Sequence, residues 1–308
     1  MITYVVGDLF QSPADVLVNT VNTVGVMGKG IAKKFKTIYP EMFETYRQLC
    51  ESKKLTIGKV WLYKTPNKWI LNFPTKTTWR NPSQMEYIEK GLQAFVNGYA
   101  ERGISSIAFP ALGCGNGELN WDTQVRPLME KYLKPLPIDI FIYIYKTASH
   151  APEHKNVKNI SDWLRQEPEV LSFSEVRLDL EKIIGSGLDL TSFYGNSAFH
   201  VQFLSDRECV QITVGNKTEL IYYEELLAFW NIIRSYGFGF PAVIPSAVAQ
   251  YQEFLLSLFE TLPYCHEIIA GKDYKEVDQS KARGIQFLPR PAVSTSLFNG
   301  NPEQLIAV

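Results

Sequence analysis

The stretch VNTVNTVGVMGKGIAKKF, residues 18–35, joins a β-branched run, a glycine-rich loop and the start of a helical pattern. Two asparagines, Asn19 and Asn22, come first, and three glycines follow within six positions: Gly25, Gly28 and Gly30. Glycine lets backbone N–H groups approach an anion, and a helix N-terminus adds partial positive charge. The stretch therefore predicts a binding loop for phosphate groups.

Spacing excludes two familiar phosphate loops. A P-loop has a lysine after its last glycine and then Ser or Thr, whereas Lys29 here precedes Gly30 and the hydroxyl residue is missing. A dinucleotide-binding fingerprint needs a small third residue, and Lys33 stands there. The loop belongs to another class of nucleotide site.

Strand and helix patterns alternate on both sides of this loop. The expected strands are 2–6, 16–20, 59–63, 69–73, 106–111 and 138–145. The expected helices are 28–38, 40–53, 84–102 and 121–133. Such alternation predicts an α/β fold with a largely parallel sheet, which binds ligands at the carboxyl ends of its strands. The loops after residues 20, 73 and 111 are the expected site.

The chain changes character beyond residue 147. A polar, proline-containing segment, 148–168, is predicted to be a linker between a first domain, 1–147, and a second, 169–308. The second is expected to be a smaller α+β domain with strands over 198–205 and 209–214 and amphipathic helices over 219–236 and 247–262.

Charge is divided unevenly between these parts. Residues 1–147 carry 18 Lys and Arg against 12 Asp and Glu, and the remainder carries 13 against 20. A basic first half suits an anionic ligand and an acidic second half suits a basic partner, although ordinary surface variation explains the difference equally well.

Several classes of protein are not expected. No apolar run approaches the roughly 20 residues of a membrane helix, and the N-terminus has no export signal, so we expect a cytoplasmic protein without membrane association. The four cysteines are widely spaced, which is typical of reduced thiols. His150 and His154 flank Pro152 without a cysteine nearby, so no metal site is expected.

Two further features complete a candidate cleft. Asp8 follows the first strand, where its carboxylate can accept a hydrogen bond from an exocyclic amine. Asn19 and Asn22 can bond hydroxyl groups or a backbone turn. A second glycine loop, PALGCGNGELNW at 110–121, can close over the same phosphates. Two glycine loops and a carboxylate suit a nucleoside diphosphate sugar.

These segments resemble the macrodomain family, which binds ADP-ribose. The resemblance covers 1–147 and rests on VGDLF (6–10), ADVLVNTVN (14–22) and PALGCGNG (110–117). It implies a three-layer α/β/α fold with a mixed, mostly parallel sheet, and no cofactor. It also implies that Asp8 holds adenine, Asn22 holds the distal ribose and Tyr145 stacks on adenine. The other implied contacts are Leu9, Asn19, Gly25, Val26, Met27, Gly28, Gly30, Thr75, Leu112, Gly113, Cys114, Gly115, Asn116 and Gly117.

VGVMGKGIA (24–32) together with NFPTK (72–76) is similar to the DarG branch of that family. DarG proteins are antitoxins of DarT toxins, which attach ADP-ribose to DNA bases, and the DarG macrodomain removes it. The resemblance implies that Lys76 is catalytic, that ADP-ribosylated single-stranded DNA is the substrate, and that the C-terminal domain binds a DarT-like toxin.

A nucleophilic lysine must be a free amine, so the pKa of Lys76 must be lowered by burial or by a cation such as Arg80. Related eukaryotic glycohydrolases have an acid where Gly117 stands here, so Glu118 or Asp122 is a candidate assistant. On the DNA side, candidate phosphate contacts are Lys33, Lys34 and Lys36, and Trp79 is either a base-stacking or a buried residue.

Two alternatives to a DNA glycohydrolase remain open from the sequence. The domain can bind ADP-ribose without turnover and neutralise a partner by contact alone. It can also hydrolyse ADP-ribose from protein carboxylates, or ADP-ribose 1″-phosphate. Lys76 favours the enzyme, because a domain that only binds ADP-ribose does not need an amine at that position.

Overall fold

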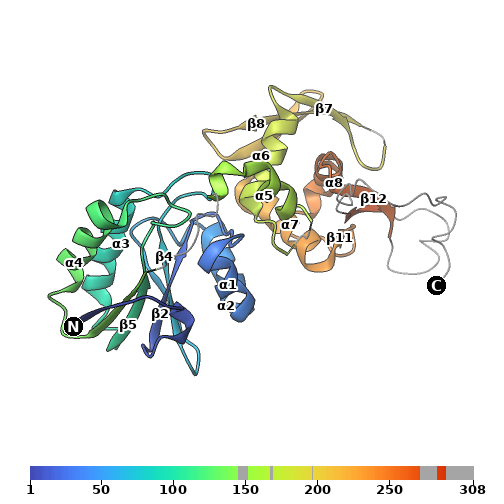
Figure 1. The fold of residues 1–308 in the computed structure, drawn as a ribbon. Coiled ribbons are helices and arrows are strands. Elements are labelled where there is room, and N and C mark those ends of the chain that lie inside the picture. The colour runs from blue at the N-terminus through green and yellow to red at the C-terminus, as the bar shows by residue number, and fades with distance from the viewer. Residues whose placement is uncertain (145–151, 167–168, 196, 271–282, 289–308) are drawn as a thin grey trace, which may run out of the picture. The chain divides into compact units, whose positions relative to one another are not determined.

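A computed structural model describes residues 1–144, 152–166, 169–195, 197–270 and 283–288 (Figure 1). The chain divides into two compact units. The first comprises Met1–Arg165 and Glu169–Leu178, and the second comprises Gln166–Pro168 and Asp179–Val308. None of the helices within the described ranges is long and apolar enough to cross a membrane.

The first unit is built on a six-stranded sheet with the order β1-β6-β5-β2-β4-β3. Its strands are β1 (Ile2–Val5), β2 (Val16–Val21), β3 (Trp61–Tyr63), β4 (Trp69–Pro74), β5 (Ser106–Pro110) and β6 (Asp139–Tyr143). All neighbouring pairs are parallel except β3 with β4. β2 is buried along almost its whole length, as expected for a central strand covered on both faces.

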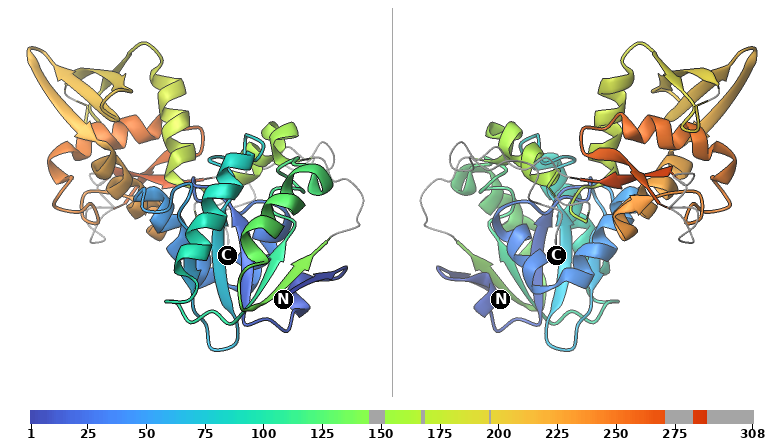
Figure 2. Two further views of the ribbon diagram at one scale, coloured as in Figure 1. Left: turned by 90° about the vertical axis from the view of Figure 1, so that its left-hand side faces the viewer. Right: turned by 90° about the vertical axis from the view of Figure 1, so that its right-hand side faces the viewer.

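Helices cover both faces of this sheet. They are α1 (Gly30–Ile38) and α2 (Pro40–Glu51) on one face and α3 (Met85–Gly98) and α4 (Arg126–Leu133) on the other. Figure 2 shows the same layers from two sides, with teal and green helices facing the viewer in one view and blue helices in the other. The predicted three-layer α/β/α fold is confirmed.

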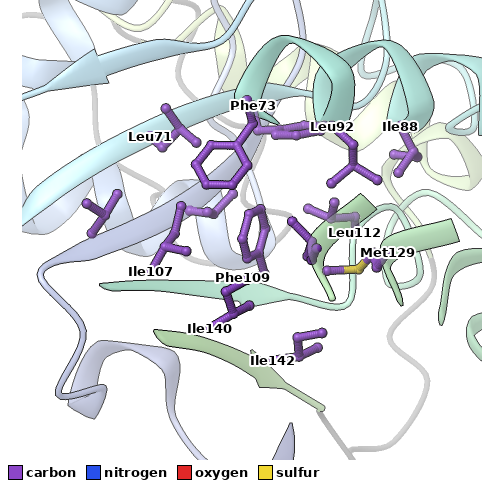
Figure 3. Close-up of a cluster of buried hydrophobic side chains, with 14 of the residues drawn as sticks. Leu71, Phe73, Ile88, Leu92, Ile107, Phe109, Leu112, Met129, Ile140 and Ile142 are labelled. Atoms are coloured by element: carbon purple, nitrogen blue, oxygen red, sulfur yellow. The ribbon is translucent and has the colours of Figure 1, made fainter. Parts of the chain in front are cut away.

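One of the two cores lies between the sheet and the pair α3 and α4. Phe73, Phe109 and Ile140 project from three strands toward Leu92 and Met129 on these helices (Figure 3). Contact is close: a Cβ added at Gly91 would lie 2.2 Å from Cζ of Phe73. A glycine at this position lets α3 pack directly on β4.

Parallel strands bring the predicted loops to one edge of the sheet. β2, β4 and β5 all end there, so the segments 22–29, 75–84 and 111–120 leave the same edge. The segment after the sheet adds a 3-10 helix, η3 (Glu153–Lys155), and helix α5 (Val157–Leu164). The described part of the predicted linker, up to Arg165, thus belongs to the first unit and contains helical structure.

The second unit contains two antiparallel sheets and helices, so the predicted α+β class is confirmed. One sheet joins β7 (Leu188–Thr191), β8 (Ala198–Leu204), β9 (Cys209–Val214) and β10 (Lys217–Tyr222). The other joins β11 (Phe238–Gly239), β13 (Arg283–Phe287) and β12 (Cys265–Ile269). The helices are α6 (Phe173–Ile184), whose first residues belong to the first unit, α7 (Tyr223–Tyr236) and α8 (Gln252–Glu260).

The helix predicted over 219–236 begins later than expected. Residues up to Tyr222 pair with β9 as the end of β10, and α7 starts at Tyr223. The carboxylate of Glu225 accepts a hydrogen bond from the backbone N–H of Tyr222 (2.8 Å), which fixes the helix start. Pairing with the preceding strand in a β-hairpin decided this boundary against the helical pattern.

Candidate active site

The first glycine loop is held in shape by the side chain of Asn22. Its Nδ2 donates to the carbonyl of Val26 (2.6 Å), and its Oδ1 accepts from the N–H groups of Val24 (3.0 Å) and Val26 (3.3 Å). Gly25 has a φ of +78°, in the region that glycine tolerates best. The sequence left two roles open for Asn22, bonding a backbone turn or bonding a hydroxyl group. The structure shows the first, and the role of Asn22 at the ribose stays a prediction.

The second glycine loop is fixed by packing at its two ends. Leu112 is fully buried in the core, and Gly113 has a φ of +68°. At Gly117 an added Cβ would lie 2.3 Å from Oγ of Ser83 and 2.4 Å from the carbonyl oxygen of Gly113. Between them, Cys114 is half-buried while a Cβ at Gly115 would meet no atom within 4 Å. The position aligned with the eukaryotic acid therefore has no room for a side chain.

The two glycine loops lie against each other. A Cβ added at Gly30 would be 2.8 Å from Nδ2 of Asn116, so the start of α1 touches the middle of the second loop. Gly30 also has a φ of +59°. This arrangement gathers backbone N–H groups of both loops at one edge of the sheet, as a diphosphate site requires.

Asp8 caps the 3-10 helix Leu9–Gln11 and Asn19 lies within β2, and both side chains are hydrogen-bonded. Asp8 accepts from the N–H of Phe10 (3.1 Å) and pairs with Nζ of Lys34 (2.7 Å), and this ammonium holds the pKa of the carboxyl below its ordinary value. Buried Asn19 donates to Oδ1 of Asn72 on β4 (2.9 Å). Oδ1 of Asn19 and Nδ2 of Asn72 have no hydrogen-bond partner among the described residues.

Lys76 follows β4 directly and is almost completely buried, with 7% of its surface exposed. Its Nζ donates to the carbonyl oxygen of Asn116 (3.1 Å) and lies 3.8 Å from Oε2 of Glu153. Burial lowers the pKa of Lys76, against the opposing effect of the carboxylates of Glu153 and Glu118. A lysine in this environment gives up its proton more easily than a surface lysine.

Arg80 is occupied elsewhere. Its guanidinium pairs with both carboxylate oxygens of Glu175 (2.7 Å for Nη2 to Oε2), and the indole Nε1 of Trp79 donates to the same carboxylate (3.0 Å). Trp79 has no exposed surface, so it is a buried indole in this structure. Of the two causes that the sequence left open, burial is thus the one that lowers the pKa of Lys76. Asp122 is largely exposed and lies 3.9 Å from Nε of Arg126.

Several contacts to the glycine loops and to Lys76 come from residues outside the predicted site. Glu153 is buried beside Lys76. Glu118 of the second loop pairs with Nε2 of His154 (2.7 Å) and with Nζ of Lys155. On the first loop, a Cβ at Gly28 would lie 3.2 Å from the ring of Trp163. All four residues fall in the polar stretch predicted as a linker, and no motif marks them.

The remaining predicted residues are placed as follows. Leu9, Val26, Met27 and Thr75 are buried, and the N–H of Thr75 donates to the carbonyl of Val21 (2.9 Å). Lys33 and Lys36 lie over the ring of Trp163, 5.8 and 5.5 Å from its centroid. Tyr145 lies outside the described residues. Where the structure describes the chain, no group of three His, Cys, Asp or Glu side chains is arranged to hold a metal ion.

Comparison with known proteins agrees with the fold and the two loops. The profile of the Macro domain family matches residues 18–128. The chain is 45% identical over 157 residues to "DNA ADP-ribosyl glycohydrolase" of Mycobacterium tuberculosis, covering 50% of this chain and 45% of that protein. It is 40% identical over 162 residues to the "DNA ADP-ribosyl transferase-DNA ADP-ribosyl glycohydrolase fusion protein" of Thermosipho africanus, covering 46% of this chain and 42% of the relative.

A shorter relative is matched over nearly its whole length. The chain is 31% identical over 143 residues to "ADP-ribose glycohydrolase OARD1" of Bos taurus, covering 46% of this chain and 90% of that protein. A three-layer α/β/α domain with two facing glycine loops defines a class of nucleotide-binding domain. Within that class, this chain belongs to the macrodomain family. It spans about half the length of the bacterial relatives that it matches.

Proposed function

We propose that this protein is a glycohydrolase that removes ADP-ribose from ADP-ribosylated DNA bases. The observation that carries the proposal is the buried Lys76, whose Nζ touches the second glycine loop at the carbonyl of Asn116. Relatives named DNA ADP-ribosyl glycohydrolases support the choice of substrate. A DNA substrate also favours a cytoplasmic location.

The proposed reaction uses Lys76 as nucleophile. Its neutral Nζ forms a bond to the anomeric carbon of the distal ribose while the bond from that carbon to the base nitrogen breaks. The bonding electron pair leaves with the base, which takes up a proton from solvent. Water then attacks the anomeric carbon of the lysyl-sugar adduct: its oxygen bonds to that carbon as the bond to Nζ breaks, which releases ADP-ribose, the neutral amine and one proton to solvent. These steps use ADP-ribose as ligand and product and call for no cofactor.

The test is release of ADP-ribose from single-stranded DNA that carries it on thymine or on guanine. Wild type should remove the label from at least one substrate, and Lys76→Ala should not. Lys90→Ala is the matched control, because Lys90 is an exposed lysine paired with Glu86 on α3. If Lys76→Ala removes the label as fast as wild type, the proposed nucleophile is wrong.

Binding without turnover is the second candidate, because the two facing glycine loops alone suffice to hold a diphosphate. In that case wild type binds free ADP-ribose, for example by calorimetry, and leaves both DNA substrates unchanged. The same assay with ADP-ribosylated protein separates the third candidate, hydrolysis from protein carboxylates. Release from protein and not from DNA would support that activity instead.

We also propose that the C-terminal half binds a DarT-like toxin. Residues 148–308 carry 13 Lys and Arg against 20 Asp and Glu, which suits a partner with a basic, DNA-binding surface. The Thermosipho relative, named as a fusion of transferase and glycohydrolase, supports an association of the two activities. The full chain should bind a purified toxin of this class, and more weakly as ionic strength rises. Absence of binding at low salt would contradict this partner.

A further inference from the structure

Glu153 is a buried carboxylate placed at the proposed nucleophile. Its side chain is only 9% exposed, and its Oε2 lies 3.8 Å from Nζ of Lys76. Burying a carboxylate costs free energy unless a charged or hydrogen-bonding partner compensates for the lost water. Lys76 forms an ion pair with Glu153 and is such a partner. A pair of this kind in a candidate cleft is a functional arrangement rather than a surface contact.

Contacts made by the residues that follow Glu153 hold it in this place. The next two residues, His154 and Lys155, pair with Glu118 of the second glycine loop. Ten residues further on, Trp163 packs against Gly28 of the first loop. The segment 152–165 thus touches both loops, and Glu153 is the first residue of the 3-10 helix Glu153–Lys155 that makes the contact to the second loop.

The second loop offers no carboxylate of its own in this place. An added Cβ at Gly117 would collide with Ser83, so an acid there would force the loop to move. Glu118 is engaged by His154 and Lys155 and is more exposed than Glu153. Among the described acidic residues, Glu153 is the one that forms an ion pair with Lys76.

The pKa values of Lys76 and Glu153 lie closer together than those of a surface lysine and a surface glutamate. Burial lowers the pKa of Lys76 and raises the pKa of Glu153. The carboxylates of Glu153 and Glu118 act against the lowering of the Lys76 pKa. The raising of the Glu153 pKa is opposed by three basic side chains: Lys76, Lys29 and His154. Transfer of a proton from the ammonium to the carboxylate is therefore less uphill than between a surface lysine and a surface glutamate.

We infer that Glu153 is the positioning and proton-accepting partner of Lys76, supplied by the segment that follows the sheet. One proton passes from the Nζ ammonium to a carboxylate oxygen of Glu153. The freed electron pair on Nζ then forms the bond to the anomeric carbon, and the bond to the base breaks. The proton returns to Nζ when water has hydrolysed the adduct. This role rests on the proposed glycohydrolase function.

The experiment compares wild type, Glu153→Gln and Glu153→Asp in the full chain, with Glu86→Gln on the exposed face of α3 as the matched control. The first measurement follows acetylation of Lys76 by acetic anhydride against pH, read by mass spectrometry. Glu153→Gln should move the midpoint to lower pH, because the ammonium loses its counter-charge. Glu153→Asp and Glu86→Gln should leave the midpoint near the wild-type value.

The second measurement is turnover of ADP-ribosylated single-stranded DNA. In Glu153→Gln we expect kcat to fall about a hundredfold at unchanged KM, the usual size of a lost acid–base partner. Glu153→Asp should recover much of this loss. An unchanged or raised kcat in Glu153→Gln overturns the inference, and so does an unmoved acetylation midpoint. A wild type that leaves the DNA intact overturns the proposed function, while the acetylation midpoint still reports on the pair.

Discussion

Lys76 on the turn after β4 and Glu153 on the segment after β6 meet with 3.8 Å between Nζ and Oε2, and both are nearly excluded from solvent. The pair joins the proposed nucleophile to a part of the chain outside the sheet. In the proposed mechanism, burial and a carboxylate that is remote in sequence prepare the amine of Lys76.

A double-mutant cycle can measure how much the Lys76–Glu153 pair contributes to the free energy of unfolding. Lys76→Met leaves Glu153 buried without its ion-pair partner, and Glu153→Gln leaves Lys76 in the same situation, so each single variant should lower the free energy of unfolding. The double variant should be less destabilised than the sum of the two, with a coupling of about 1 kcal/mol. Denaturant unfolding measures the cycle, and strictly additive effects would show that the two groups do not interact.

The pH dependence of turnover follows from the lowered pKa of Lys76. A protonated Nζ has no free electron pair, so activity should fall as pH drops through that pKa and stay constant above it. Because burial lowers the pKa, the fall should come at lower pH than for an ordinary lysine. A rate profile of kcat against pH checks this. Activity that rises as the pH falls would show that the ammonium form acts instead.

The contact between the two glycine loops is tested by Gly30→Ala. The added Cβ would lie 2.8 Å from Nδ2 of Asn116, so the Asn116 side chain must move away from the first loop, and ADP-ribose affinity should fall at least about tenfold, or 1.4 kcal/mol. Gly103→Ala is the control, since Gly103 also has a positive φ, of +73°, but no atom within 4 Å of the new Cβ. Calorimetric titration should show normal binding for Gly103→Ala, and equal losses would assign the effect to backbone strain.

Glu175 is expected to matter for stability rather than for turnover. Its carboxylate is 1% exposed and binds Arg80 and Trp79, so Glu175→Gln leaves the partly buried guanidinium of Arg80 without its counter-charge. The free energy of unfolding should fall by about 3 kcal/mol. Thermal unfolding compared with exposed Glu86→Gln measures this difference. A loss no larger than in Glu86→Gln would mean that solvent compensates Arg80.

Much of the fold follows from local pattern. The alternation of apolar strands and amphipathic helices predicted every strand of the first sheet, with shifts of up to two residues at the ends. The glycines at positions 25, 30 and 113 have positive φ, so their spacing marked real turns. Local pattern failed at Glu219–Tyr222, where a helical stretch ends as strand β10 because pairing with β9 is more favourable than another turn of helix.

The site was predicted in part, and the reason lies in sequence distance. Lys76 and the two glycine loops carry motifs of their own. Glu153, His154 and Trp163 carry none, because their positions depend on how a polar segment packs on loops more than 35 residues away. The ion pair of Arg80 could not be predicted from the sequence either, since its partner Glu175 is far along the chain.

By itself, the sequence determined the α/β/α layers and the glycine loops and predicted Lys76 as the reactive lysine, since these depend on periodicity, backbone freedom and side-chain chemistry within short segments. Only the tertiary structure decided which carboxylate faces that lysine and which residues cover the loops. Burial and charge pairing arise from contacts between distant segments, and these contacts decide the pKa of Lys76 and with it the proposed chemistry.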